Sequence, residues 1–528
     1  MFTSLRALAI PYLCGLLLAL AALGALWYGV GRPVPLADLS TAGHKLQCAS
    51  YTPFGKDQSP FDQPLKIRHE QVDIDFARLA SRFKCVRTYS QSGLEALPAL
   101  ARKHGLKLLA GAWVSSNAAD TEREIAALIA SAKAHPDVIE AVIVGNEALL
   151  RKEVSAAQLI QLIERVKTEI EQPVTYADVW EFWIRHPQIA PAVDFITIHL
   201  LPYWEDDPAG IDAALEQVSK VRRAFGAAYA PKDILIGETG WPSEGRQRET
   251  ALPSRINEAL FIRGFVRLAE ENGWQYNLIE AFDQPWKRAS EGAVGGYWGL
   301  FDANRQDKGI LAGPVSNLPH WPQWLAASGL LLFAALFLAG RPGSRRAALL
   351  LPPTAALGAA CIFGWAELAL ITSRNGAEWL WAIALLGLNL LVLAHALLAL
   401  SAGGGWRQRT FAWLQARSGW WLAAAGFAGA VLMLGLVFDA RYRSFPSAAL
   451  LLPALIYLCR PVTGPRREIA LLACIIAAGI APQLYQEGLH NLQAIGWALT
   501  SALLTGALWR SLRHASNHPT GRSTCTDG

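Results

Sequence analysis

Eight short apolar segments alternate with amphipathic helical patterns in the first part of this 528-residue chain. The segments read as strands at residues 45–51, 85–89, 106–114, 138–145, 173–177, 193–200, 233–237 and 276–282. Apolar residues between them recur with the helical period, for instance at 71–82, 155–171 and 253–272. Strands that alternate with helices predict an α/β fold with a parallel sheet, and eight units in about 270 residues match a (β/α)8 TIM barrel. A doubly wound open sheet is the structural alternative, but the region contains no glycine-rich phosphate loop.

Uncharged runs long enough to cross a bilayer flank this region. The first, at 7–30, is too long for a signal peptide and lacks a small-residue cleavage site, so we expect an uncleaved anchor. Seven more lie at 322–340, 347–371, 378–400, 420–438, 446–459, 468–484 and 492–509, and the fifth is short for a span. The predicted parts are an N-terminal anchor and linker (1–42), the barrel (43–314), a C-terminal α-helical transmembrane bundle of seven spans (315–510) and a disordered cytoplasmic tail (511–528).

Arginines are unevenly distributed over the loops between these runs. One set of alternate loops carries Arg341, Arg345, Arg346, Arg407, Arg409, Arg417, Arg460, Arg466, Arg467, Arg510 and Arg513, and the opposite set carries only Arg374, Arg441 and Arg443. Because basic loops stay in the cytoplasm, the barrel is expected on the other side. The sequence therefore predicts a multi-pass protein of the bacterial inner membrane whose barrel faces the periplasm. Much of the basic excess behind the net charge of +5 lies in loops beside these apolar runs. The lipid bilayer is therefore an expected partner, and nucleic acid is not.

Cysteine usage argues against a metal or redox motif. Of seven cysteines only Cys48 and Cys85 fall in the barrel region, and no Cys-x-x-Cys pair occurs. The two are expected on adjacent strands, as buried free thiols rather than a disulfide.

Two of the predicted strands end in a glutamate. Residues 138–147 read VIEAVIVGNE and end in Glu147, and residues 234–239 read ILIGET and contain Glu238. A lone strand-end glutamate is more often a cap or an ion-pair partner, but strand ends of a barrel meet at one mouth, so these two can face each other. Paired carboxylates suit glycosidic bond cleavage, in which one protonates the departing oxygen and the other attacks the anomeric carbon. This chemistry needs no metal and no cofactor.

The same two motifs, VGNE and ILIGETGWPS, resemble those of glycoside hydrolase family 17, the β-1,3-glucanase family, over residues 43 to 310. The resemblance implies that Glu147 is the acid/base and Glu238 the nucleophile. It also implies sugar contacts from Asn146 in VGNE, Tyr51 in CASYTPF, and Phe282 and Lys287 in EAFDQPWK. The barrel is similar to that of bacterial proteins associated with β-1,3/β-1,6-glucan synthesis. One departure is Gln284, where plant members have a glutamate, which puts the acceptor subsites in doubt.

Further candidates lie near the predicted strand ends. Aromatic side chains that could stack on glucose are Tyr51, Trp180, Trp183, Tyr203, Trp204, Trp241, Trp286 and Trp298, of which Tyr51, Tyr203 and Trp298 are the first choices. His199 and Arg87 are expected to support the carboxylates.

The predicted function is a membrane-bound retaining enzyme that cleaves β-1,3-glucosidic bonds in a β-glucan polysaccharide or oligosaccharide. Three alternatives stay open. A sugar hydroxyl instead of water as acceptor would make the chain a transglycosylase that remodels β-1,3/β-1,6-glucans beside a glucan synthase. A silent barrel would make it a glucan-binding scaffold. Glu367 and His395 within the apolar runs would suit a transporter, although both lie towards the ends of their runs.

Overall fold

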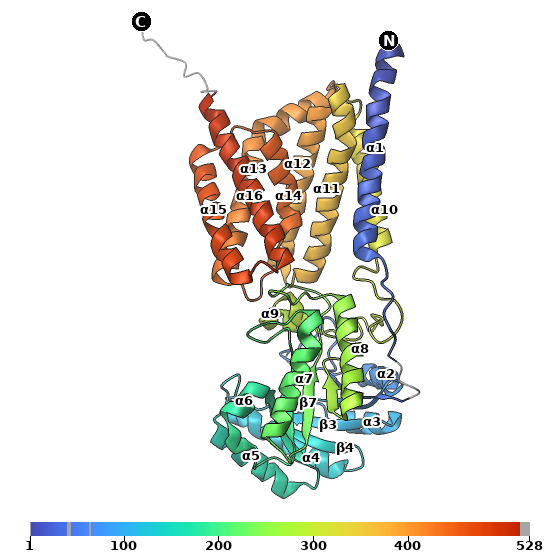
Figure 1. Cartoon of the computed structure of the whole chain (residues 1–528), viewed down its shortest axis with the longest axis vertical. Coiled ribbons are helices and arrows are strands. Elements are labelled where there is room, and N and C mark those ends of the chain that lie inside the picture. The colour runs from blue at the N-terminus through green and yellow to red at the C-terminus, as the bar shows by residue number, and fades with distance from the viewer. Residues whose placement is uncertain (1, 40–43, 63–64, 518–528) are drawn as a thin grey trace. The chain divides into compact units, whose positions relative to one another are not determined.

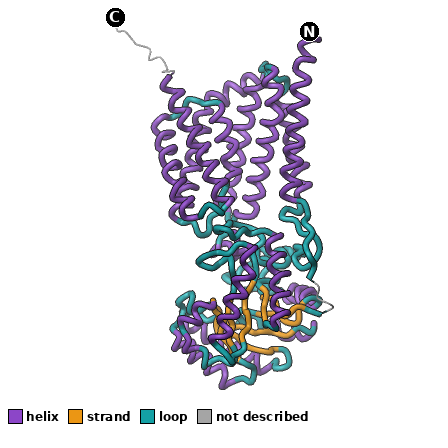
Figure 2. The backbone as a smooth tube through the Cα atoms, viewed as in Figure 1, coloured by secondary structure: helices purple, strands orange, loops and turns teal. Residues whose placement is uncertain are grey.

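The structure is a computed structural model that describes residues 2–39, 44–62 and 65–517 (Figure 1). The chain forms two compact units. One is Val34–Val315, and the other joins Met1–Pro33 to Ser316–Gly528. Strands occur in the first unit, and the second consists of helices and loops (Figure 2).

Eight parallel strands close into a barrel in the order β1 to β8, which confirms the predicted TIM barrel. The strands are β1 (Leu46–Ser50), β2 (Phe83–Arg87), β3 (Lys107–Ala112), β4 (Ile139–Asn146), β5 (Val174–Val179), β6 (Ile196–His199), β7 (Ile234–Thr239) and β8 (Gln275–Leu278). Nearly every strand residue is buried, as expected for a parallel sheet covered by helices. This burial explains why the strands read as continuous apolar runs.

Helices connect the strands and cover the barrel from outside (Figure 1). They are α2 (His69–Ala80), α3 (Leu97–His104), α4 (Ala118–Ala134), α5 (Ala156–Glu169), α6 (Trp180–Arg185), α7 (Ile211–Ala228), α8 (Arg255–Asn272) and α9 (Arg288–Glu291), with short 3-10 turns η1 (Pro187–Ile189), η2 (Pro285–Lys287) and η3 (Ala293–Gly296). The side chain of Asn117 caps α4, and Ser155 forms a capping box with Gln158 on α5. Gly273 ends α8 in the left-handed conformation.

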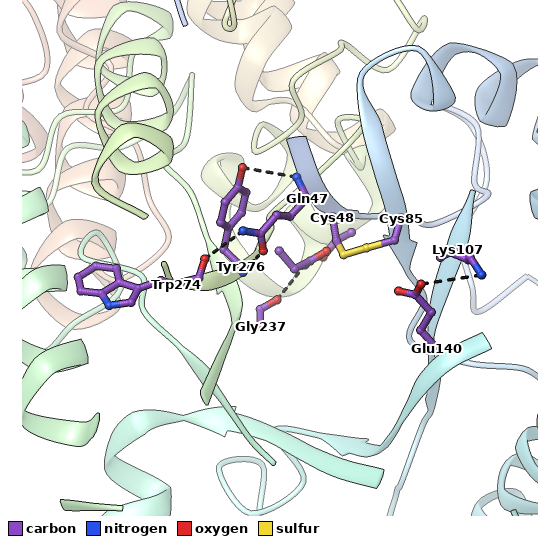
Figure 3. The surroundings of a disulfide bond; sticks show 10 residues. Gln47, Cys48, Cys85, Lys107, Glu140, Gly237, Trp274 and Tyr276 are labelled. Carbon is purple, nitrogen blue, oxygen red and sulfur yellow. Dashed lines mark hydrogen bonds and ion pairs between the residues drawn. A yellow bond between two sulfur atoms is a disulfide. The ribbon is translucent and has the colours of Figure 1, made fainter. Parts of the chain in front are cut away.

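Cys48 and Cys85 form a disulfide inside the barrel, so the expectation of two free thiols is wrong (Figure 3). The reason is register. The two residues are direct partners in the parallel pair β1–β2, with Cα atoms 4.6 Å apart, so their side chains leave the same face side by side. Strand prediction placed both residues on neighbouring strands but could not supply this register.

The second unit contains α1 (Phe2–Gly31), α10 (Trp321–Ala339), α11 (Arg345–Thr372), α12 (Gly376–Leu400), α13 (Trp406–Phe438), α14 (Ser447–Cys459), α15 (Arg466–Glu487) and α16 (Leu492–Asn517). Within the described residues, seven of these are long and apolar enough to span a membrane, and α14 is the shorter one. Helix α16 continues to Asn517, so the boundary expected at residue 511 falls inside a helix. Residues 518–528 of the expected tail lie outside the described residues.

Side chains of α1 pack against α10 within this unit. The indole of Trp27 stacks on Trp324, and its Nε1 donates to Ser328 Oγ at 2.9 Å. Gly15 meets the backbone of Leu349 on α11, where a Cβ would lie only 2.4 Å from the carbonyl oxygen. The N-terminal helix is therefore an integral member of the helical unit.

Candidate active site

The structure brings both strand-end glutamates together at the carboxyl ends of the barrel strands. Glu238 is the penultimate residue of β7, and Glu147 directly follows β4. His199, the last residue of β6, lies between them: Nδ1 is 2.9 Å from Glu147 Oε1, and Nε2 is 3.6 Å from Glu238 Oε1. One carboxylate oxygen of each glutamate and a ring nitrogen of His199 all lie within 4.8 Å of one another. Convergence of strand ends therefore produces a pair of facing carboxyl groups.

Arg87, at the end of β2, is fully buried beneath this pair. Its Nη1 donates to the Gly237 carbonyl at 2.7 Å and to Glu238 Oε1 at 3.2 Å, and its Nη2 donates to Asn146 Oδ1. Gly237 leaves room for this contact, because a Cβ there would lie 3.4 Å from Nη1 and 2.3 Å from the Thr197 methyl. Arg87 and Asn146 thus hold the two strand ends together, and a buried guanidinium compensates the carboxylate charge.

The backbone around Glu147 is irregular. Gly145 and Glu147 have positive φ angles of 87° and 51°, and the β4–β5 register shifts between Ile143 and Asn146. A left-handed glutamate is uncommon and is maintained only by surrounding contacts, here a 2.9 Å bond from the Arg151 amide to the Glu147 carbonyl. The irregular strand end turns the Glu147 side chain, 23% exposed, into the mouth.

His199 lies between Glu147 and Arg87. Its Nδ1 donates to Glu147 Oε1 at 2.9 Å, and its Nε2 lies 3.5 Å from Arg87 Nη1. Burial raises the pKa of Glu147, but the hydrogen bond from His199 and the charges of His199, Arg151 and Arg87 outweigh it. The pKa of Glu147 therefore lies below its ordinary value in the unliganded site.

Sequence reasoning missed Tyr89 and Asp178. Tyr89, two residues after Arg87, donates its hydroxyl to Glu238 Oε1 at 2.9 Å. The period-2 alternation of β2 is the signal that could have identified it, because Arg87 and residue 89 face the same side. Asp178 is buried near the end of β5, where Tyr176 donates to it, and burial raises the pKa of Asp178 to about 6.

A second cluster of titratable side chains, Glu280, Lys287 and Glu291, lies beside the carboxyl pair. Lys287 bonds both carboxylate oxygens of Glu280 at 2.9 and 3.0 Å, so its ammonium is already engaged. Burial raises the pKa of Glu280 and of Glu291, each to about 7. Gln284 is buried and accepts from Trp286 Nε1 at 2.9 Å, so in this chain the amide orients an aromatic ring.

The three aromatic first choices and the further candidate Trp241 are core residues in the unliganded structure. Tyr51, Tyr203, Trp298 and Trp241 are each at most 3% exposed. Their polar atoms also have protein partners: Tyr51 donates to Asp75, Tyr203 to the Arg246 carbonyl and Trp241 to the Leu252 carbonyl. None of the four presents a free ring face that could stack on a sugar.

Other aromatics beyond the strand ends are partly exposed. They follow β3, β5, β6 and β8, and are Trp113, Trp180, Trp204 and Trp286. Trp204 stacks on the buried Trp298 at 6.4 Å between ring centroids, so the inner tryptophan supports the outer one. Residue type alone therefore does not separate the supporting ring from the exposed one.

The cluster also contains residue types that bind metals. Arg87, however, already donates to Glu238 and lies 3.5 Å from His199. Its positive charge would oppose a second cation between the same groups.

Comparison with known proteins is consistent with this geometry. Residues 48–299 match the BtgE/BtgC glycoside hydrolase domain. Over 262 residues the chain is 28% identical to the probable beta-glucosidase btgE of Aspergillus fumigatus, covering 48% of this chain and 44% of that protein. Over 253 residues it is 28% identical to the glucan 1,3-beta-glucosidase of Schizosaccharomyces pombe, covering 44% of this chain and 77% of that protein. The chain thus spans less than half the length of the first of these relatives.

A solved structure, the glycoside hydrolase family 17 beta-1,3-glucanosyltransferase from Rhizomucor miehei, is 23% identical with a TM-score of 0.45 and covers 51% of this chain and 97% of that one. The barrel of this chain is a glycoside hydrolase domain, as the family resemblance predicted from the two strand-end motifs.

Proposed function

We propose that this chain is a membrane-bound retaining enzyme that cleaves β-1,3-glucosidic bonds, with Glu147 as acid/base and Glu238 as nucleophile. The observation that carries the proposal is the spacing of the two carboxyl groups: one oxygen of Glu147 lies within 4.8 Å of one oxygen of Glu238. Retaining glycosidases place their carboxyl groups about 5–5.5 Å apart, whereas inverting enzymes need about 6.5–9.5 Å to admit a water molecule. The names of the relatives support a β-1,3-glucan as the substrate.

In the first step an oxygen of Glu238 bonds to the anomeric carbon, the glycosidic C–O bond breaks, and the Glu147 proton passes to the departing oxygen. Among the described residues, Arg87 and Tyr89 both donate to Oε1 of Glu238. Oε2 is therefore the oxygen available for attack, and the two donors fix its direction.

In the second step Glu147, now ionised, takes a proton from the acceptor. The acceptor oxygen bonds to the anomeric carbon, and the ester bond to Glu238 breaks. The lowered pKa of Glu147 in the unliganded site suits this base role. A bound glucan excludes water from the mouth and adds to the burial that raises the pKa of Glu147, which favours the acid form for the first step.

Product analysis of the detergent-solubilised full chain tests the proposal. On defined β-1,3-gluco-oligosaccharides we expect shorter products whose newly formed reducing end is initially the β-anomer, observed by proton NMR before mutarotation. Initial formation of the α-anomer would contradict the retaining assignment. Products longer than the donor would keep the glycosyl-enzyme step and assign a sugar acceptor in place of water.

The membrane assignment rests on the helical unit. Seven described helices have the length and composition of spans. The arginine-rich alternate loops support a cytoplasmic position for those loops, which leaves the barrel on the opposite face, the periplasm in a bacterium. The Cys48–Cys85 disulfide is independent support, because disulfides persist in oxidising compartments.

The disulfide gives a test of that compartment. In chain purified from membranes without reductant, we expect mass spectrometry to find the peptides of Cys48 and Cys85 linked. The disulfide joins two residues that lie 37 positions apart. Replacing both cysteines by serine removes this cross-link and is expected to lower the free energy of unfolding of the barrel by about 3–4 kcal/mol. Complete alkylation of both thiols at lysis, with no change in thermal stability of the serine variant, would contradict an oxidising location.

A further inference from the structure

We infer that Arg151 is a positioning residue for Glu147: stacked on Trp113, it holds the left-handed turn from which the acid/base carboxyl reaches the glycosidic oxygen. This inference rests on the proposed function of Glu147. The proposed role of Arg151 requires no contact with the nucleophile or with the sugar.

Arg151 bonds to the turn through both its backbone and its side chain. Its amide donates to the Glu147 carbonyl at 2.9 Å, and its Nη1 donates to the Asn146 carbonyl. Its Nη2 reaches the Val114 carbonyl at 3.3 Å, in the loop that follows the neighbouring strand β3. One guanidinium therefore ties the residue before Glu147 to the adjacent strand end.

Trp113 fixes the guanidinium in this place. The Arg151 guanidinium carbon lies 4.0 Å from the centre of the Trp113 ring, well within cation–π distance. Trp113 follows β3 directly, and Ala112 pairs in register with Val144 on β4. The tryptophan thus belongs to the same rim as Glu147, and an arginine is suited to the pair because its planar group stacks and donates at once.

The turn needs such a contact because Glu147 has a φ of 51° without being glycine. The preceding Gly145 has a φ of 87°, so two positions close together leave regular strand geometry. A small relaxation there would swing the carboxyl away from the glycosidic oxygen, where a misplacement of about 1 Å can lower the rate about 100-fold.

The charge of Arg151 acts on the same carboxyl. The other titratable groups that influence or face Glu147 come from several elements: Arg87, Asp178, Tyr176, His199, Glu238 and Glu291. Arg151 is one of the cations that lower the pKa of Glu147. Removing this charge raises that pKa, so the basic limb of kcat/KM, which reports the protonated acid in the free enzyme, should move to higher pH.

Two donors separate positioning of the acid from other roles. A laminari-oligosaccharide has a sugar leaving group that needs a proton, whereas the dinitrophenolate of a 2,4-dinitrophenyl β-laminaribioside departs without one. In Arg151→Met we expect kcat/KM to fall about 10- to 100-fold on the oligosaccharide and less than about 3-fold on the dinitrophenyl donor. Arg151→Lys, which keeps the charge, should leave the basic limb near its wild-type pH while losing part of kcat.

Arg222→Met is the matched control. Arg222 also stacks on a tryptophan, Trp274 at 5.6 Å, and donates to the carbonyl of Ile234, the first residue of β7 and so at the far end of that strand from Glu238. Any change in kcat/KM of this variant should be the same for both donors. If Arg151→Met does not accumulate, Trp113→Leu removes the same stacking contact but keeps the charge of Arg151. This variant should show a smaller fall in kcat/KM, confined to the oligosaccharide.

An equal fall on both donors, or a raised KM for both, would overturn the inference and make Arg151 a folding or sugar-binding residue. An unmoved basic limb would also overturn it. Glu147→Gln separates this failure from failure of the proposed function: if that variant shows no difference between the donors, Glu147 is not the acid. If it does and Arg151→Met does not, only the role of Arg151 is lost.

Discussion

Glu238→Gln is expected to lower kcat on β-1,3-gluco-oligosaccharides by about 10⁴-fold or more while oligosaccharide affinity stays close to that of the wild type. The amide cannot form the glycosyl ester, but its oxygen can still accept from Tyr89 and Arg87, which now bond Oε1. Calorimetric titration with an oligosaccharide measures affinity, and single-turnover assays measure the residual rate.

Glu280→Gln is the control for this substitution. Glu280 is a buried carboxylate after the adjacent strand β8 and is neutralised by Lys287 rather than by Arg87. The same chemical change there should leave a far higher rate than Glu238→Gln. Comparable losses in the two variants would show that Glu238 is one charge among several in the mouth and would remove the nucleophile assignment.

Glu147→Gln is expected to separate the two steps of the reaction. On oligosaccharides the loss of the acid should lower kcat/KM by about 10²–10⁴-fold, whereas a 2,4-dinitrophenyl donor should still form the glycosyl-enzyme. The intermediate then accumulates because no base activates water. Azide, which attacks without a base, should restore turnover and give a β-glycosyl azide.

Glu140→Gln serves as the control for Glu147→Gln. Glu140 lies at the start of β4, at the opposite end of the strand that Glu147 follows, where its exposed carboxylate is 3.9 Å from Lys107. Its kinetics should stay close to those of the wild type. An α-glycosyl azide from Glu147→Gln, or no rescue by azide, would contradict the acid/base role.

The barrel and its carboxyl pair could be predicted from the sequence because both depend on local pattern. Buried parallel strands read as apolar runs, and the ends of β4 and β7 carry Glu147 and Glu238 at positions that any closed barrel brings to one mouth. His199 and Arg87 also end their strands, so their supporting contacts with the pair follow from the same rule.

Features that depend on register or on depth could not be predicted in this way. The Cys48–Cys85 bond needs the β1–β2 register. Tyr203 and Trp298 are buried while Trp204 beside them is partly exposed, a difference that follows from loop packing and leaves no trace in residue type. Arg151 was missed because its role is made by a stack on Trp113, which lies 38 positions earlier in the chain.

The central claim is that Glu238 forms a covalent glycosyl-enzyme, and trapping that species tests it most directly. A 2-deoxy-2-fluoro-β-laminaribiosyl fluoride reacts slowly in both steps but retains a good leaving group, so the intermediate persists. Mass spectrometry of the digested wild-type chain should find one added fluorolaminaribiosyl group, on the peptide that contains Glu238, and none in Glu238→Gln. A label on another carboxylate, or the absence of any label from a chain that still cleaves oligosaccharides, would contradict the account.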